Sequence, residues 1–155
     1  MALVKKFRIL LIEDDSIQSN VYQSALSRFD AEITVTDTVT EAIRMFLRSP
    51  PSLCIVDLGI YLTKGEFDRE GGLKFLEQAS GAHPSVPLIV LTAIRDPEIL
   101  LRCFVAGCHD YIIKGDGFDD AVARLKYWID ALPVSKAELE RHKSEAVAAL
   151  KLDVV

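Results

Sequence analysis

The chain has 155 residues, of which 50% are hydrophobic and 26% are charged, a composition typical of one soluble globular domain. Its formal net charge of -5 argues against broad binding to nucleic acid or to an anionic membrane, because both need a basic face. Three cysteines without a secretory signal favour a reducing cytoplasm over a disulfide framework. No apolar run approaches the length of a membrane span.

Strand-like and helix-like segments alternate from the amino terminus. Residues 7–12 form an apolar run that predicts a strand, and the acids after it predict the cap of a helix that runs to about Phe29. Residues 32–36 alternate apolar and polar side chains, which predicts a strand nearer an edge. Thr38 and Glu41 have the spacing of a capping box, which opens a second helix.

The middle of the chain contains the segment that organises the rest. Residues 53–56 are four apolar residues that predict a strand buried on both faces, and Asp57 follows it at once. A carboxylate there lies at the carboxyl end of a central strand, where open α/β sheets bind ligands, although an Asp after a strand can also only start a turn or cap a helix. A polar loop over residues 59–70 and a short helix over 72–79 are expected next.

The alternation continues to the carboxyl end. Residues 87–92 predict another buried strand, Asp96 caps a helix that ends near Gly107, and residues 109–113 predict the fifth strand. A fifth helix follows, and a second capping-box pattern from Ser135 predicts an extra helix that is either packed on the domain or the start of a linker. Strict alternation predicts right-handed crossovers and a parallel sheet with helices on both faces.

Several chemically active side chains stand at the ends of predicted strands. Parallel strands bring their carboxyl ends together, so the sequence predicts convergence of Glu13, Asp14, Asp57, Thr92 and Lys114. Three close carboxylates need a cation, and oxygen ligands without His or Cys suit Mg²⁺. A Lys and a hydroxyl beside them would bind the oxygens of an incoming phosphoryl group, which an Asp can accept.

Four short motifs in this order resemble the receiver domain of bacterial two-component response regulators. They are Ile12-Glu13-Asp14-Asp15, Val56-Asp57, Leu91-Thr92-Ala93 and Tyr111-Ile112-Ile113-Lys114. The resemblance covers residues 5–131 and leaves residues 134–152 as a C-terminal helical extension or linker. It implies a flavodoxin-like sheet of five parallel strands in the order 2-1-3-4-5, with five helices plus the extra one.

The resemblance also implies a role for each matching residue. Asp57 would take the phosphoryl group, Asp14 would ligate Mg²⁺ directly, Glu13 would act through water, and the Gly59 backbone carbonyl would supply a third protein oxygen. The phosphoryl-binding and switch residues would be Thr92, Ala93, Lys114 and Tyr111, with the tyrosine changing rotamer as the threonine moves.

The same resemblance implies a phosphorylation switch that is not an enzyme in its own right. A sensor histidine kinase or a histidine phosphotransfer protein would donate the phosphoryl group, and a downstream protein would bind the surface that phosphorylation changes. No direct nucleic-acid or membrane partner is expected, and a homodimer is compatible with this function. The serious alternative is a degenerate receiver that acts as an unphosphorylated adaptor.

Three departures from the family pattern matter. Gly115 stands where the family usually has Pro, which predicts a looser loop around Lys114. The loop after Asp57 is several residues longer than usual in the family. Its charges are either only solvated, or the loop is a partner-recognition or lid element. Its charged residues are Lys64, Glu66, Asp68, Arg69 and Glu70. Neither Gly59 nor Ile94 offers a polar side chain to orient a hydrolytic water, so slow self-dephosphorylation is expected unless an acid of the long loop restores that function.

Other readings of the sequence are weaker. An aspartyl-nucleophile phosphatase needs a second acid at the position of Gly59, and the phosphate of a flavin would be repelled by the acids after the first strand. Cys103, Cys108 and His109 have loosely metal-like spacing, with only His83 and His142 to complete a zinc site. Cys54 is expected to behave as a small buried hydrophobe.

Overall fold

The fold is taken from a computed structural model that describes residues 6–154, with side chains described through residue 150. Lys5, the first residue of the expected receiver domain, lies outside the described residues. The side chain of Leu152, in the last expected helix, lies outside them as well.

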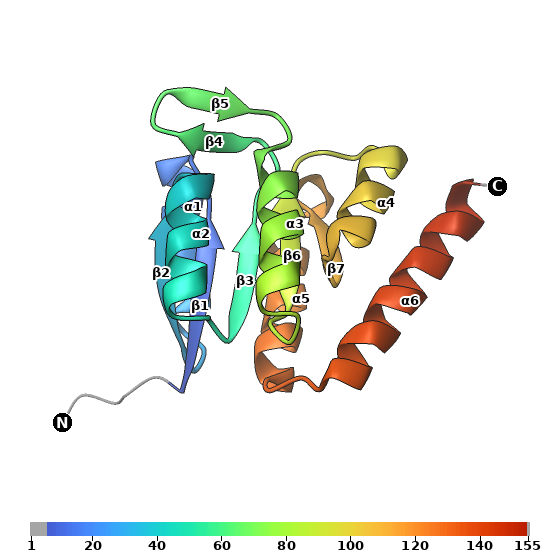
Figure 1. Ribbon diagram of the computed structural model, residues 1–155. Coiled ribbons are helices and arrows are strands. Elements are labelled where there is room, and N and C mark those ends of the chain that lie inside the picture. The colour runs from blue at the N-terminus through green and yellow to red at the C-terminus, as the bar shows by residue number, and fades with distance from the viewer. Residues whose placement is uncertain (1–5, 155) are drawn as a thin grey trace.

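Five parallel strands form the central sheet in the order β2-β1-β3-β6-β7 (Figure 1). Their bounds are β1 Phe7–Ile12, β2 Ala31–Thr36, β3 Leu53–Val56, β6 Leu88–Thr92 and β7 Asp110–Ile113. The parallel register sets Ile12 beside Val56 and Thr92 beside Ile113, so the carboxyl ends of these strands share one edge. The predicted flavodoxin-like order 2-1-3-4-5 is confirmed, with β6 and β7 as the fourth and fifth strands of the sheet.

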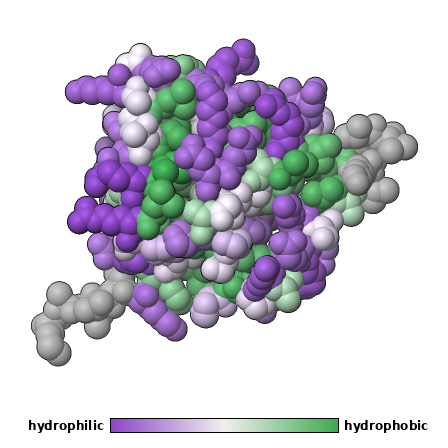
Figure 2. Space-filling view, in the orientation of Figure 1, coloured by the Kyte–Doolittle hydropathy of each residue, from purple (hydrophilic) through white to green (hydrophobic). Residues whose placement is uncertain are grey.

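Helices cover both faces of the sheet because the buried strand residues alternate between them. The helices are α1 Ser16–Leu26, α2 Val39–Arg48, α3 Gly71–Ala82, α4 Pro97–Ala106, α5 Phe118–Ala131 and α6 Lys136–Val154. Leu10 and Ile12 point into the core formed with α2, α3 and α4. Ile9 and Leu11 point into the second core, which is formed with α1 and α5. Most of the face in Figure 2 is hydrophilic, with hydrophobic side chains in narrow strips.

The predicted helix caps are present, with two differences in detail. The Asp15 carboxylate caps α1 by accepting from the backbone N–H of Ile17 at 2.9 Å, but the helix ends at Leu26 and not near Phe29. Thr38 Oγ1 accepts from the backbone N–H of Glu41 at 3.2 Å. The capping box is only half formed, because the glutamate side chain pairs with Arg44 in the next turn.

The segment after Asp57 is a hairpin and not the polar loop that was expected. Strand β4, Ile60–Thr63, pairs antiparallel with β5, Glu66–Asp68, and Gly65 at the turn has a φ of 87°, which favours glycine. The hairpin is fixed to α2, since Thr40 Oγ1 donates to the Leu62 carbonyl at 2.9 Å. The following helix begins at Gly71, so it is longer than the predicted segment 72–79.

Helix α6 packs on the domain and does not leave it as a linker. Leu139 is buried in the core that contains α5, whereas Val147 and Leu150 pack against the core on the other face of the sheet. The helix therefore runs past the edge strand β7 and beside α4 (Figure 1). Covering an edge strand removes a surface on which another chain could pair. Among the helices of residues 6–154, none is long and apolar enough to cross a bilayer.

His109 is a buried titratable group in the contact between β7 and α6. Its Nδ1 accepts from the backbone N–H of Leu88 at 3.0 Å, and the residue is only 7% exposed. Burial, followed by repulsion from Lys143, lowers the pKa of His109 to about 4. The remaining charged neighbours on α6 are Glu140, which opposes the shift, and His142, which adds to it.

We expect acidification to destabilise the domain through this histidine. The native state keeps His109 neutral, while the unfolded chain takes up a proton near the ordinary pKa of 6.5, so the free energy of unfolding falls as pH falls from 6.5 to 4. The loss should reach about 3 kcal/mol. Urea unfolding at pH 7 and pH 4.5 measures it, with His109→Asn as the comparison, because the Asn oxygen still accepts from Leu88 but does not titrate. Equal pH slopes for the two proteins would contradict this account.

Candidate functional site

Three acidic side chains meet at the carboxyl edge of the sheet. Glu13 and Asp14 follow β1, and Asp57 follows β3, which is the neighbouring strand. One carboxylate oxygen from each lies within 4.8 Å of the others. The convergence predicted from the order of strands is therefore present for these three acids.

Lys114 joins this cluster from the end of β7. Its Nζ lies 2.8 Å from Glu13 Oε2 and 3.1 Å from Asp57 Oδ2, and it also donates to Gln18 Oε1. The 3-10 helix Lys114–Asp116 follows directly, and the lysine side chain is 12% exposed. Three oxygen partners fix the ammonium group, although Gly115 stands after it and predicted a looser loop.

Gln18 is a site residue that the sequence reasoning missed. It lies in the first turn of α1, where Asp15 accepts from its backbone N–H at 3.2 Å. A helix that begins directly after an acidic pair brings its first turn to the same edge of the sheet. That position in the first turn was the signal that could have identified it.

The site holds buried charges that depend on each other. Glu13 is 5% exposed, and burial followed by repulsion from Asp57 raises its pKa to about 7. Burial disfavours the charge on Lys114, but attraction to Asp57 and the bond to Glu13 outweigh it, so the pKa of Lys114 is raised. Two or three negative charges thus face one positive charge, which leaves the cluster with excess negative charge.

The donor set fits a hard divalent cation. Of the residues that the structure describes, Glu13, Asp14 and Asp57 form the group of oxygen ligands close enough to hold a metal ion. Carboxylate oxygens without His or Cys suit Mg²⁺, which keeps waters of its own. A hollow of about 530 Å³ that is lined in part by Glu13 and Asp14, but not by Asp57, lies next to the cluster. The part of Gly59 as a carbonyl ligand stays a prediction.

The predicted switch residues lie at the ends of β6 and β7. Thr92 is 1% exposed, and its Oγ1 accepts from the backbone N–H of Ile94 at 3.4 Å. Tyr111 is buried, and its hydroxyl donates to the Ile94 carbonyl at 2.7 Å. Ala93, which lies between Thr92 and Ile94, is exposed. Threonine and tyrosine are therefore joined through one backbone segment, while no hydrogen bond links Thr92 to the acids within residues 6–154.

The glycine after the acceptor strand is covered by the hairpin. A Cβ placed on Gly59 would lie 3.2 Å from Cζ of Phe67, so the aromatic ring occupies the space of the missing side chain. The acids of the hairpin point to other partners. Asp68 pairs with Lys74 at 2.6 Å, and Glu70 pairs with Arg102 at 2.6 Å.

The zinc alternative finds no support in the described residues, where the one candidate metal group is the acidic cluster. Nδ1 of His109 is already occupied by the Leu88 N–H. Burial raises the pKa of the Cys103 thiol to about 12, and Cys54 is fully buried as expected of a small hydrophobe. These thiols are therefore disfavoured as thiolate ligands.

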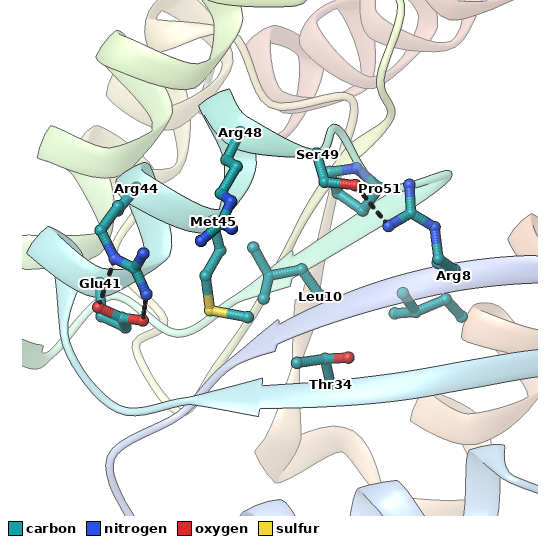
Figure 3. Close-up of a pocket in the computed structure, with 10 residues that line it drawn as sticks. Arg8, Leu10, Thr34, Glu41, Arg44, Met45, Arg48, Ser49 and Pro51 are labelled. Carbon is teal, nitrogen blue, oxygen red and sulfur yellow. Dashed lines mark hydrogen bonds and ion pairs between the residues drawn. The ribbon is translucent and has the colours of Figure 1, made fainter.

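A separate hollow of about 310 Å³ lies between α2 and strands β1 and β2 (Figure 3). Two of its arginines are engaged with neighbours: Arg44 pairs with Glu41, and Arg8 Nη1 donates to Ser49 Oγ at 2.7 Å. None of the three clustered acids lines it. The chemistry at the sheet edge therefore does not extend into this hollow.

The fold and the site together define a doubly wound α/β domain of the response-regulator type. Residues 9–126 match the family described as the response regulator receiver domain, and the chain belongs to this family. Phosphorylation and Mg²⁺ binding are typical of the family. Helix α6 lies outside the matched residues.

Relatives with curated names agree with this assignment. The chain is 26% identical over 119 residues to the transcriptional regulatory protein KdpE of Staphylococcus aureus, which covers 77% of this chain and 48% of that protein. It is 27% identical over 120 residues to the sensory transduction protein BceR of Halalkalibacterium halodurans, covering 77% of this chain and 48% of that protein. The chain thus spans about half the length of these relatives.

Solved structures share the fold. A CheY-like receiver domain protein from Methanospirillum hungatei superposes with a TM-score of 0.68 at 22% identity, covering 80% of this chain and 94% of that one. The BeF3-activated DrrB receiver domain superposes with a TM-score of 0.67 at 18% identity, covering 80% and 97%. At these identities the likeness supports the fold alone.

Proposed function

We propose that this receiver domain is a signalling switch that is phosphorylated on Asp57 with the help of Mg²⁺. The observation that carries the proposal is the position of Lys114 Nζ, 3.1 Å from Asp57 and 2.8 Å from Glu13, inside a cluster with excess negative charge. An ammonium group held beside a carboxylate can follow one oxygen of a phosphoryl group that the carboxylate receives.

The transfer itself is a displacement at phosphorus. An Asp57 carboxylate oxygen attacks the phosphorus of a phosphohistidine, the new O–P bond forms, the N–P bond breaks, and the imidazole leaves with a proton from solvent. Lys114 and the Thr92 hydroxyl bind the oxygens of the transferred group. Mg²⁺ held by Asp14, Asp57 and the Gly59 carbonyl, with Glu13 acting through water, would supply the positive charge that offsets these anions.

The donor is a sensor histidine kinase or a histidine phosphotransfer protein, since receiver domains interact with histidine kinases. The domain receives the group and does not turn over a separate substrate. We take residues 5–131 as the receiver and 134–152 as its helical extension, in a cytoplasmic protein. The output passes to a protein partner or to a segment outside this chain, through the face near Tyr111.

One experiment separates this switch from an unphosphorylated adaptor. The purified chain is incubated with Mg²⁺ and phosphoramidate, a small phosphoryl donor, and its intact mass is recorded. We expect a single phosphoryl adduct, because Asp57 and Lys114 are already in contact. The absence of any adduct would favour the adaptor.

Mg²⁺ should stabilise the protein against heat. Bound metal relieves the repulsion among the clustered acids and binds only the folded state. At a concentration one hundred times its Kd, it should add about 2.7 kcal/mol, which corresponds to a Tm increase of roughly 5–10 °C. Thermal unfolding with and without Mg²⁺ measures this change.

The matched variants are Asp14→Ala and Asp37→Ala. Asp14 belongs to the cluster, whereas Asp37 only lines the neighbouring hollow. We expect the first variant to lose the response to Mg²⁺ and the second to keep it. The metal site would be wrong if Asp14→Ala responded as the native chain does.

A further inference from the structure

The aromatic ring of Phe67 lies against the backbone close to the acceptor residue. Gly59 is two residues after Asp57, a separation of about 7 Å at most along the backbone. Cζ of Phe67 lies 3.2 Å, and Cε2 3.8 Å, from the position that a Cβ on Gly59 would take. The ring comes from the hairpin, so a residue eight positions further along the chain fills space that residue 59 leaves open.

The hairpin holds this ring in a fixed position. Tyr61 packs edge to face against Phe67 with 5.4 Å between ring centroids, and it also forms a parallel bridge with Thr38 at the start of α2. At the other end of the hairpin, the Asp68 carboxylate accepts from the backbone N–H of Glu70 at 2.8 Å. These contacts restrain the segment that carries the Phe67 ring beside Gly59.

No acid of the hairpin takes this place instead. Glu66 accepts from the Thr63 hydroxyl at 3.2 Å, while Asp68 and Glu70 are bound to Lys74 and Arg102. The possibility that a loop acid restores water orientation is therefore not supported by the geometry. The side chain that reaches Gly59 is apolar.

The Phe67 ring is only partly covered by the protein. Phe67 is 52% exposed, which leaves much of a large apolar side chain in water. The covered part of the ring packs against Tyr61 and lies next to Gly59. A change of this side chain therefore alters the surroundings of Gly59 without opening the hydrophobic core.

We propose that Phe67 is a positioning residue that keeps hydrolytic water away from the phosphorylated Asp57 and so lengthens the life of the signal. The inference rests on the proposed function, because it concerns the phosphorylated state of the same carboxylate. Hydrolysis forms a bond from water oxygen to phosphorus and breaks the bond from phosphorus to Asp57, which yields inorganic phosphate and the free carboxylate. An apolar ring neither orients that water nor accepts its proton.

The test is the rate at which the adduct decays. The chain is phosphorylated with phosphoramidate and Mg²⁺, the donor is removed, and intact mass is followed over time. The variants are Phe67→Leu, which keeps an apolar side chain, Phe67→Ala, which opens the space, and Phe67→Gln, which brings a polar group to it. We expect Phe67→Leu to decay within about two-fold of the native rate and the other two to decay about ten-fold faster.

Two further readouts separate positioning from damage to the fold. The rate of adduct formation and the Mg²⁺-dependent rise in Tm should stay near native in every Phe67 variant, because the phenyl ring supplies neither a charge to the transfer nor a ligand to the metal. Tyr127→Ala serves as a control, since Tyr127 is a similarly exposed aromatic on α5. Its adduct should decay at the native rate.

The outcomes are distinguishable. Normal adduct formation with equal decay in the native chain, Phe67→Ala and Phe67→Gln would overturn the role of Phe67 alone. A native chain that forms no adduct would overturn the proposed function and this inference with it. Faster decay in Phe67→Ala and Phe67→Gln, with rescue in Phe67→Leu, supports the inference.

Discussion

Replacing Asp57 with Asn should abolish phosphoryl incorporation completely. The amide has nearly the shape of the carboxylate, but it is a poor nucleophile and no longer attracts a metal ion. The fold should survive and should even gain stability without metal, because the repulsion that raises the pKa of Glu13 is reduced while Lys114 keeps Glu13 and Gln18 as partners. Intact mass after incubation with Mg²⁺ and phosphoramidate checks the first effect, and urea unfolding checks the second.

Asp15→Asn is the matched control for this variant. Asp15 caps α1 and is not among the three clustered acids, and an Asn side chain also caps a helix. This control should form the same adduct as the native chain. An adduct that persists in Asp57→Asn would place the acceptor elsewhere.

Replacing Lys114 with Met should slow incorporation by about 10²–10³-fold, the usual effect of removing one group that stabilises developing charge. The methionine side chain is unbranched and one atom shorter, and it lacks the charge that lies between Asp57 and Glu13. Breaking such a buried pair also costs stability, about 3–5 kcal/mol, unless protonation or metal relieves the remaining acids. The time course of the mass shift and urea unfolding with and without Mg²⁺ measure the two effects.

Lys74→Met is the control, because Lys74 on α3 also pairs with an aspartate but has a side chain that is 53% exposed. A surface pair of this kind contributes about 0–1 kcal/mol, and the lysine lies away from the acids of the site. Both readouts should stay near native. If Lys114→Met incorporated phosphoryl within two-fold or three-fold of the native rate, the lysine would have no part in the transfer.

Most of the strands and caps could be predicted because they depend on neighbours in the sequence. The run 53–56 is apolar at every position, and all of β3 is buried. Asp15, Thr38 and Asp96 were expected at helix starts, and each accepts from a backbone N–H there. Helix ends were less certain, as the early end of α1 shows, since fraying and packing decide them.

The hairpin was missed because its stability comes from contacts with distant residues. Its strands are short, and Thr38 and Thr40 of the α2 start hold β4 in place. A local signal existed nonetheless, in the pair Lys64-Gly65 between two short segments that contain β-branched and aromatic residues. Strand propensity is weak and depends on context, so the run of charges in this segment favoured a loop instead.

The sequence by itself determined the order of strands and helices, and with it the meeting of Glu13, Asp14, Asp57 and Lys114 at one edge. Periodicity and capping act over a few residues, and parallel strands necessarily bring their carboxyl ends together. Only the tertiary structure decided that Gln18 binds the lysine, that Phe67 covers Gly59 and that α6 packs across β7. These placements depend on sums of weak contacts between segments far apart in the chain, and no local pattern encodes such sums.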